Sequence, residues 1–149
     1  MTREESRARR ELEALAAQPR GRELLQLALR GIQASDCGLT IGCWVKPGGG
    51  VSGCVFQHAY WQGVSEGVFV TADNAGKEIR QAVDEHDFRL VMSAIRALDQ
   101  LGRRRFLKRD GLHRKLDEEA WRGTVESLLL DALAGGGPEP AREPVANTA

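Results

Sequence analysis

The stretch that decides the fold is residues 37–72, which read CGLTIGCWVKPGGGVSGCVFQHAYWQGVSEGVFVTA. It carries only two charged side chains, Lys46 and Glu66, whereas the sequence on either side is rich in charge. It also contains every cysteine of the chain, and its many β-branched and aromatic residues are typical of strands. We therefore expect a charge-poor centre made of strands, set in a charged helical frame.

Three short strands are predicted in this centre. From Leu39 to Val45 apolar residues alternate with Thr40, Gly42 and Trp44, and the runs Val51–Trp61 and Glu66–Thr71 are rich in strand-forming residues. The links between them, residues 46–50 and 62–65, are short, which favours antiparallel neighbours and a small β-meander. The alternative is a mostly helical chain in which part of Val51–Trp61 is helical and the centre is an irregular insertion.

Amphipathic helices are predicted on both sides of the centre. Apolar residues recur at helical spacing within residues 3–17, 20–33, 74–84, 86–101 and 117–134. Thr2, Asp73 and Asp117 stand where helix N-caps are expected. The predicted fold class is therefore α+β, with N-terminal helices, a small antiparallel β-meander and a C-terminal helical layer.

A single domain is predicted over residues 1–134. Within it, residues 1–18 are a candidate for a loosely attached helix, because their apolar stripe is thin and Pro19 interrupts the helical pattern. Residues 135–149 are rich in glycine and proline and contain little apolar area, so they are expected to form a disordered tail.

The composition narrows the class of protein. The chain has 149 residues, of which 42% are hydrophobic, and its 21 basic side chains balance 21 acidic ones. This argues against a globally basic nucleic-acid binder and against an acidic solvating protein. Three cysteines do not make a disulfide scaffold. Neither a signal peptide nor a membrane-spanning stretch is evident, so no membrane association and a cytoplasmic location are expected.

The sharpest chemical pattern is formed by Cys37, Cys43, Cys54 and His58. In an antiparallel hairpin closing at Pro47–Gly50, Cys43 would lie opposite Cys54. Three thiolates and an imidazole can hold a tetrahedral zinc ion, and they are a less usual set for an iron–sulfur cluster. The spacing argues against both, because only Cys54 and His58 are as close in sequence as paired zinc ligands usually are. A redox disulfide between Cys43 and Cys54, a Cys–His nucleophile and simple packing are the other interpretations.

A basic segment runs from Arg96 to Lys115. It contains eight basic residues against Asp99 and Asp110, a local balance of +6. Its candidate contacts with phosphate groups are Arg103, Arg104, Arg105 and Lys108. The other interpretation is a solvated face, or one that is neutralised by the acidic residues between positions 117 and 131.

These patterns favour a small non-enzymatic regulatory or accessory protein that binds a macromolecule and needs no cofactor. Its predicted partner-binding residues are the four cations just named together with Tyr60 and Trp61, which lie in a segment that mixes aromatic and amide side chains. A protein partner is expected first; nucleic acid and a second copy of the chain are the other candidates. The alternative function is a metal-binding or redox-sensing protein that uses Cys37, Cys43, Cys54 and His58 with zinc or an iron–sulfur cluster.

Overall fold

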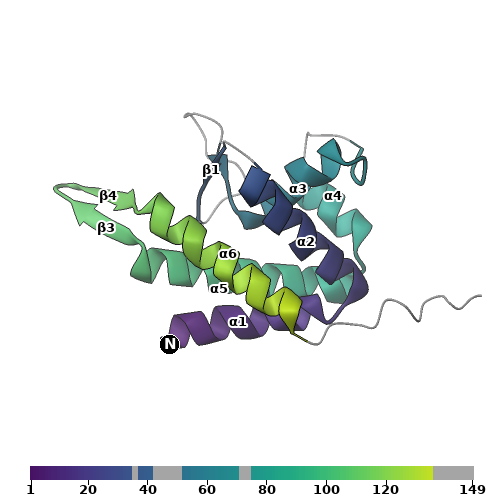
Figure 1. Ribbon diagram of the computed structural model, residues 1–149, viewed down its shortest axis with the longest axis horizontal. Coiled ribbons are helices and arrows are strands. Elements are labelled where there is room, and N and C mark those ends of the chain that lie inside the picture. Colours follow the sequence, from purple (N-terminus) through teal and green to yellow (C-terminus); the bar gives the residue numbers. More distant parts are fainter. Residues whose placement is uncertain (35–36, 42–51, 71–74, 136–149) are drawn as a thin grey trace, which may run out of the picture.

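The computed structural model describes residues 1–34, 37–41, 52–70 and 75–135, and these residues form a mostly helical α+β fold (Figure 1). The helices are α1 (Arg3–Ala16), α2 (Pro19–Ala34), α3 (Val55–Ser65), α4 (Ala75–Ala82), α5 (Glu85–Arg105) and α6 (Glu118–Ala134). The strands are β1 (Gly38–Leu39), β2 (Ser52–Gly53), β3 (Leu107–Asp110) and β4 (His113–Leu116). The predicted fold class, with N-terminal helices and a C-terminal helical layer, is confirmed.

The five predicted helical segments are all found, and three of them, α1, α5 and α6, have N-termini capped by polar side chains. Asp73, the predicted cap of the segment that forms α4, lies outside the described residues. The Thr2 hydroxyl accepts from the backbone N–H of Glu5 at 3.2 Å, and an Asp117 carboxylate oxygen accepts from that of Ala120 at 3.3 Å. At α5 the cap is Asp84, which accepts from the N–H of Asp87 at 2.8 Å. Each bond satisfies an N–H that has no partner within its helix, so the local sequence fixes where the helix begins.

The core lies where the N-terminal and C-terminal helices meet. Helix α1 packs along α5 and α6, while α2 packs most extensively on α3 (Figure 1). Trp121 of α6 is the largest fully buried side chain, and Tyr60 and Phe56 of α3 come next. The α2–α3 contact is close because Gly31 has no side chain: a Cβ built there would lie 2.5 Å from the carbonyl oxygen of His58.

The centre of the chain differs from the predicted meander. Most of Val51–Trp61, expected to be a strand, belongs to helix α3, which continues through the expected loop 62–65. The first six residues of α3 are all buried, from Val55 to Tyr60. A helix that is buried on all sides shows no amphipathic period, and its β-branched and aromatic residues then resemble those of a strand.

The third predicted strand, Glu66–Thr71, is a helix end instead, as far as its described residues 66–70 go. Gly67 has a φ of 81°, a left-handed conformation that glycine adopts at no steric cost. The N–H of Gly67 donates to the carbonyl of Val64, and that of Val68 to the carbonyl of Gly63. This pair of bonds is the Schellman motif, which ends α3 and turns Phe69 back onto Tyr60.

The pairing next to the cysteines is also different. Strands β1 and β2 pair in parallel, with Gly38 opposite Ser52 and Leu39 opposite Gly53. The predicted antiparallel hairpin, which would have set Cys43 opposite Cys54, is therefore wrong for residues 52–53, because these residues pair with β1 in parallel. Cys54 follows β2 directly and is the N-cap residue of α3. Cys43 itself lies outside the described residues. Among the helices that are described, none has the length and apolar character needed to cross a membrane.

Candidate functional site

The most prominent feature of the surface is the β3–β4 hairpin, which projects from the body between α5 and α6 (Figure 1). The strands are antiparallel, and the pairing of Asp110 with His113 leaves a two-residue loop, Gly111–Leu112. Gly111 has a φ of 65°, and glycine at the first loop position is the arrangement of a type II′ turn. Leu112 at the tip is fully exposed to solvent. The hairpin therefore presents an apolar tip on a tight, regular turn.

Behind the tip, the hairpin places like charges opposite each other. Arg109 pairs with Arg114, and Lys108 pairs with Lys115. Successive residues of a strand point to opposite faces, so one pair lies on each face of the hairpin. Directly opposed like charges are destabilising, and all four side chains are exposed. No ion pair to any of them is present within the described part of the chain.

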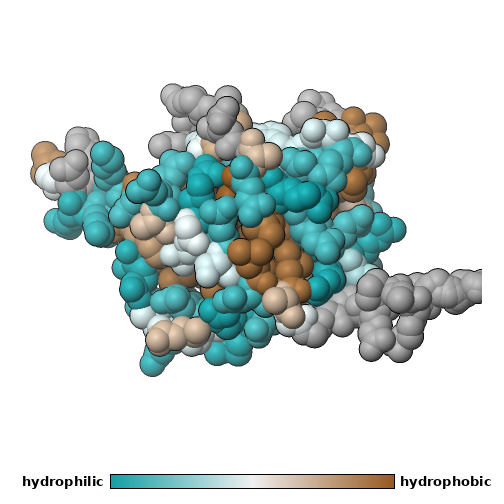
Figure 2. Space-filling view, viewed as in Figure 1, coloured by the Kyte–Doolittle hydropathy of each residue, from teal (hydrophilic) through white to brown (hydrophobic). Residues whose placement is uncertain are grey.

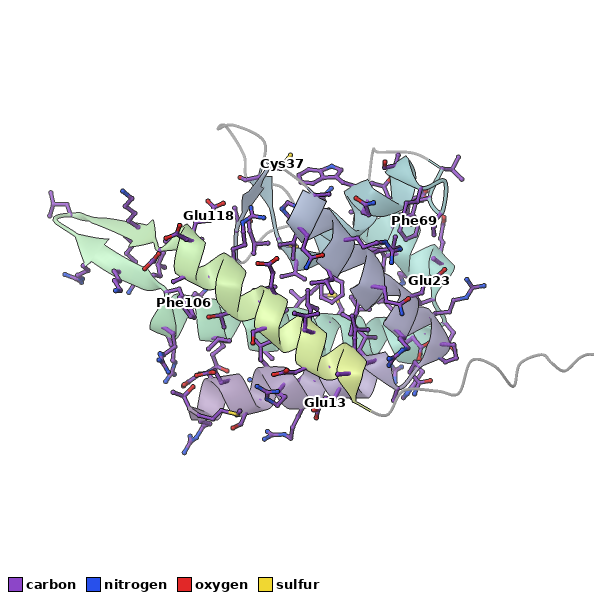
Figure 3. The ribbon with its side chains drawn as sticks, in the orientation of Figure 1. Glu13, Glu23, Cys37, Phe69, Phe106 and Glu118 are labelled. Carbon is purple, nitrogen blue, oxygen red and sulfur yellow. The ribbon has the colours of Figure 1, made fainter. Side chains whose placement is uncertain are left out.

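The base of the hairpin is fixed to the core. Phe106 contacts Trp121 with a ring-centroid distance of 5.4 Å, and the N–H of Asp117 donates to the carbonyl of Phe106 at 2.8 Å. Figure 3 shows Phe106 where α5 gives way to the hairpin and Glu118 at the start of α6. Leu107 and Leu116 form the first strand pair and are half-buried. The exposed cations are therefore presented by an arm whose root is well packed.

The arginines at the end of α5, which the sequence suggested as contacts, are engaged with carboxylates of the same molecule. Arg103 pairs with Asp99 at 3.1 Å, Arg104 with Glu4 at 3.4 Å and Arg105 with Glu5 at 3.6 Å. These pairs are solvent-exposed and individually weak, but they place an acidic group beside each arginine. Of the four predicted cations, Lys108 is the one located on the hairpin.

Three hairpin cations were missing from the predicted site: Arg109, Arg114 and Lys115. The sequence signal that could have located them is Gly111, which suits the first loop position of a type II′ hairpin turn, between two short runs that each contain a leucine. The strands themselves carry few strand-forming residues, which hides them. Beside the hairpin is a hollow of about 520 Å³, bordered by its lysines and by Asp117 and Glu118.

A second polar cluster holds the backbone of residues 37–40. Arg122 donates to the carbonyls of Cys37 at 2.8 Å and Ile32 at 2.7 Å, and Glu118 accepts from the N–H of Leu39 at 2.9 Å. Trp121 donates to the carbonyl of Thr40 at 3.3 Å. Figure 3 shows Glu118 and Cys37 on the same side of the molecule, around β1. The first two turns of α6 thus fix β1, which has only two residues and little pairing of its own.

His58 completes this cluster from α3. Its Nε2 lies 2.9 Å from the carbonyl oxygen of Gly38. Because a carbonyl can only accept, Nε2 carries the proton and Nδ1 of the neutral ring carries the lone pair. Nδ1 is buried and has no hydrogen-bond partner among the described residues. Burial lowers the pKa of His58, although the Gly38 carbonyl opposes this shift; Arg122 lowers the pKa further and Glu118 raises it.

This lowered pKa predicts acid sensitivity. In the unfolded chain histidine binds a proton near pH 6.5, whereas folded His58 does so at lower pH. Between these values the unfolded state binds more protons, so the free energy of unfolding falls as the pH falls below about 6.5. We expect His58→Gln, which keeps a donor for the Gly38 carbonyl, to reduce the drop in melting temperature between pH 7.5 and pH 5. The control is His86→Gln, at an exposed histidine, and it should retain the full drop in melting temperature. Equal drops in the wild type and in both variants would contradict the role of His58 in the acid sensitivity.

Three of the four predicted metal ligands, Cys37, Cys54 and His58, lie within the described residues. Cys54 is buried at the start of α3, one helical turn before His58, and Cys37 is half-buried at the entry to β1. In the described residues no three histidine, cysteine or acidic side chains are grouped so that they could hold a metal ion. Cys43, the fourth predicted ligand, lies outside those residues. The metal and redox interpretations stay predictions, and no feature of the described residues favours them.

The two predicted aromatic contacts have different surroundings. Tyr60 is buried, and its ring lies 5.3 Å from that of Phe69. Trp61 is half-buried, and its ring lies nearly perpendicular to that of His58 with a centroid distance of 5.3 Å. Trp61 and His58, together with Gly31 and Gln62, border a shallow cavity of about 280 Å³ between α2 and α3. Of the predicted pair, Trp61 is therefore the one with solvent-accessible surface to offer a partner.

In comparisons with known proteins, no family model, no curated protein and no solved structure matches this chain, so its own residues carry the functional argument.

Proposed function

We propose that this chain is a small non-enzymatic accessory protein that binds nucleic acid through the β3–β4 hairpin. The observation that carries the proposal is the paired cations, Lys108 with Lys115 and Arg109 with Arg114, held opposite each other on an arm that projects into solvent. Repulsion between these like charges raises the free energy of the isolated protein. The phosphate groups of a bound polyanion would reduce that repulsion.

The placement of charge supports nucleic acid over an acidic protein surface. One cation pair lies on each face of the hairpin, so a flat partner would meet only half of the charge. Phosphate groups on both sides of a groove would meet all of it. In Figure 2 the visible side chains along the arm are mainly hydrophilic, which suits a polar, charged contact.

The test compares two variants that each remove three positive charges. Replacing Arg109, Arg114 and Lys115 by glutamine removes hairpin cations, and replacing Arg103, Arg104 and Arg105 by glutamine removes cations that are paired within the protein. Affinity for a 20-base-pair duplex is measured by fluorescence anisotropy between 50 and 200 mM salt. We expect the hairpin variant to bind roughly tenfold more weakly or worse, with a salt slope flatter by about 2.7, the value for three lost phosphate contacts.

The α5 variant should keep a slope close to that of the wild type, because its cations are already neutralised by Asp99, Glu4 and Glu5. The hairpin variant should also melt at the same or a higher temperature, since its opposed charges are gone. Equal slopes for both variants, or no salt-dependent binding by the wild type to any nucleic acid, would refute the proposal.

A further inference from the structure

We infer that the hairpin enters the major groove of B-form DNA tip first and sets Leu112 against the base edges on the groove floor. This inference rests on the nucleic-acid function proposed above and adds the kind of duplex, the groove and the contacting residue. Its starting point is that Leu112, a large apolar side chain, is fully exposed at the apex of a charged arm. An apolar residue in that position has no partner to pack on within the described residues.

The distribution of charge along the arm indicates how it would be oriented. A ribbon that lay flat on DNA would need cations on one face only, whereas here each face carries a pair. When the arm enters a groove by its tip, its two faces turn toward the two phosphate backbones. Lys108 and Lys115 then reach one backbone, and Arg109 and Arg114 reach the other.

The dimensions of the arm agree with this orientation. A strand rises about 3.4 Å per residue, so the cation pairs lie roughly 7–10 Å behind the tip. The major groove of B-form DNA is about 8.5 Å deep and about 12 Å wide, and it admits a two-stranded ribbon. With Leu112 on the floor, the cations are level with the phosphates at the rim. The minor groove is about 6 Å wide, and the major groove of A-form RNA is too narrow for side chains to read.

The groove floor also offers a chemical match for leucine. In the major groove the C5 methyl group of thymine is the apolar feature that a protein can contact, while the other base edges present hydrogen-bonding groups. Leu112 has no hydrogen-bonding group, so thymine is the base it suits. Three carboxylates belong to this region: Asp117 and Glu118 stand at the root of the hairpin, beside Lys108 and Lys115, and Asp110 lies opposite His113 in the last strand pair before the loop.

The experiment uses the full chain and three 20-base-pair duplexes: alternating dA–dT, the same sequence with uracil for thymine, and an A-form RNA duplex. Uracil lacks the C5 methyl group but leaves the phosphates in place. We expect the thymine duplex to bind about fourfold more tightly than the uracil duplex, the factor for burying one methyl group, and both to bind more tightly than RNA. Leu112→Ala should lose the preference for thymine while its salt slope stays that of the wild type.

The outcomes separate this inference from the proposed function. Salt-dependent binding with equal affinity for the thymine and uracil duplexes, or equal affinity for the RNA duplex, would overturn the tip-first mode and leave nucleic-acid binding intact. Preference for thymine that survives in Leu112→Ala would also overturn it. Absence of binding to all three duplexes would refute the proposed function itself, and with it the mode of entry.

Discussion

Replacing Gly31 by alanine should lower the free energy of unfolding by about 2 kcal/mol, in the range seen when a packed interface is given extra atoms. The added Cβ would lie 2.5 Å from the carbonyl oxygen of His58, 3.1 Å from its carbonyl carbon and 3.2 Å from the Cβ of Gln62. The two closest atoms belong to the backbone of α3, which cannot rotate away. Helices α2 and α3 must then separate, and their mutual contact is the most extensive in the fold.

The matched control is Gly123→Ala on α6. A Cβ at Gly123 meets no atom within 4 Å. The substitution there replaces glycine by the best helix former, so we expect a gain of about 0.5–1 kcal/mol. Urea denaturation of both variants measures the difference. We expect the free energy of unfolding to fall in Gly31→Ala and to rise in Gly123→Ala. Equal free energies of unfolding in the two variants would contradict the close packing of α2 on α3 at Gly31.

Replacing Trp121 by alanine should cost about 3–5 kcal/mol, the range for removing a large aromatic side chain from a core. Trp121 is almost completely buried, contacts Phe106 at the root of the hairpin and donates a hydrogen bond to the Thr40 carbonyl. It thus joins α6 to the end of α5 at the root of the hairpin and to the backbone that follows β1.

Two further variants divide this cost into its parts. Trp121→Phe keeps an aromatic ring but loses the N–H donor to Thr40, so it should lose about 1–3 kcal/mol. Trp61→Ala removes the same side chain from a half-buried site and should cost clearly less than Trp121→Ala. Free energies of unfolding from urea titrations rank the three variants. If Trp61→Ala gave the largest loss in free energy of unfolding, the placement of Trp121 at the centre of the core would be contradicted.

The helical frame was predictable because its signals are local. The five flanking helices follow apolar spacing and N-cap residues such as Thr2 and Asp117, and both kinds of signal act within a few residues. Helix α3 was not predictable in the same way. Its residues from Val55 to Tyr60 are buried on all sides, so no amphipathic period distinguishes a helix from a strand. Its one clear signal is the Glu66–Gly67 end followed by an apolar residue.

The candidate site was predictable in charge but not in geometry. The excess of positive charge between Arg96 and Lys115 is visible in the sequence. Which of these cations are available depends on Glu4 and Glu5 in α1, about a hundred residues away, and no local pattern indicates such pairing. The two-residue β1 is likewise held by side chains from α6 and α3, a dependence that only the tertiary structure shows.

The root of the hairpin makes the arm a separable module. The hydrogen bond between Phe106 and Asp117 and the half-buried pair of Leu107 and Leu116 hold the junction of α5 and α6, so residues 108–115 can be exchanged or grafted without removing a side chain that packs on the core. Adding one residue to each strand would extend the reach of the arm by about 3.4 Å and place the new pair on the alternate face. The length of the arm and the face on which each charged side chain lies are therefore coupled. A change of one residue in each strand also moves the charged residues beyond it to the opposite face.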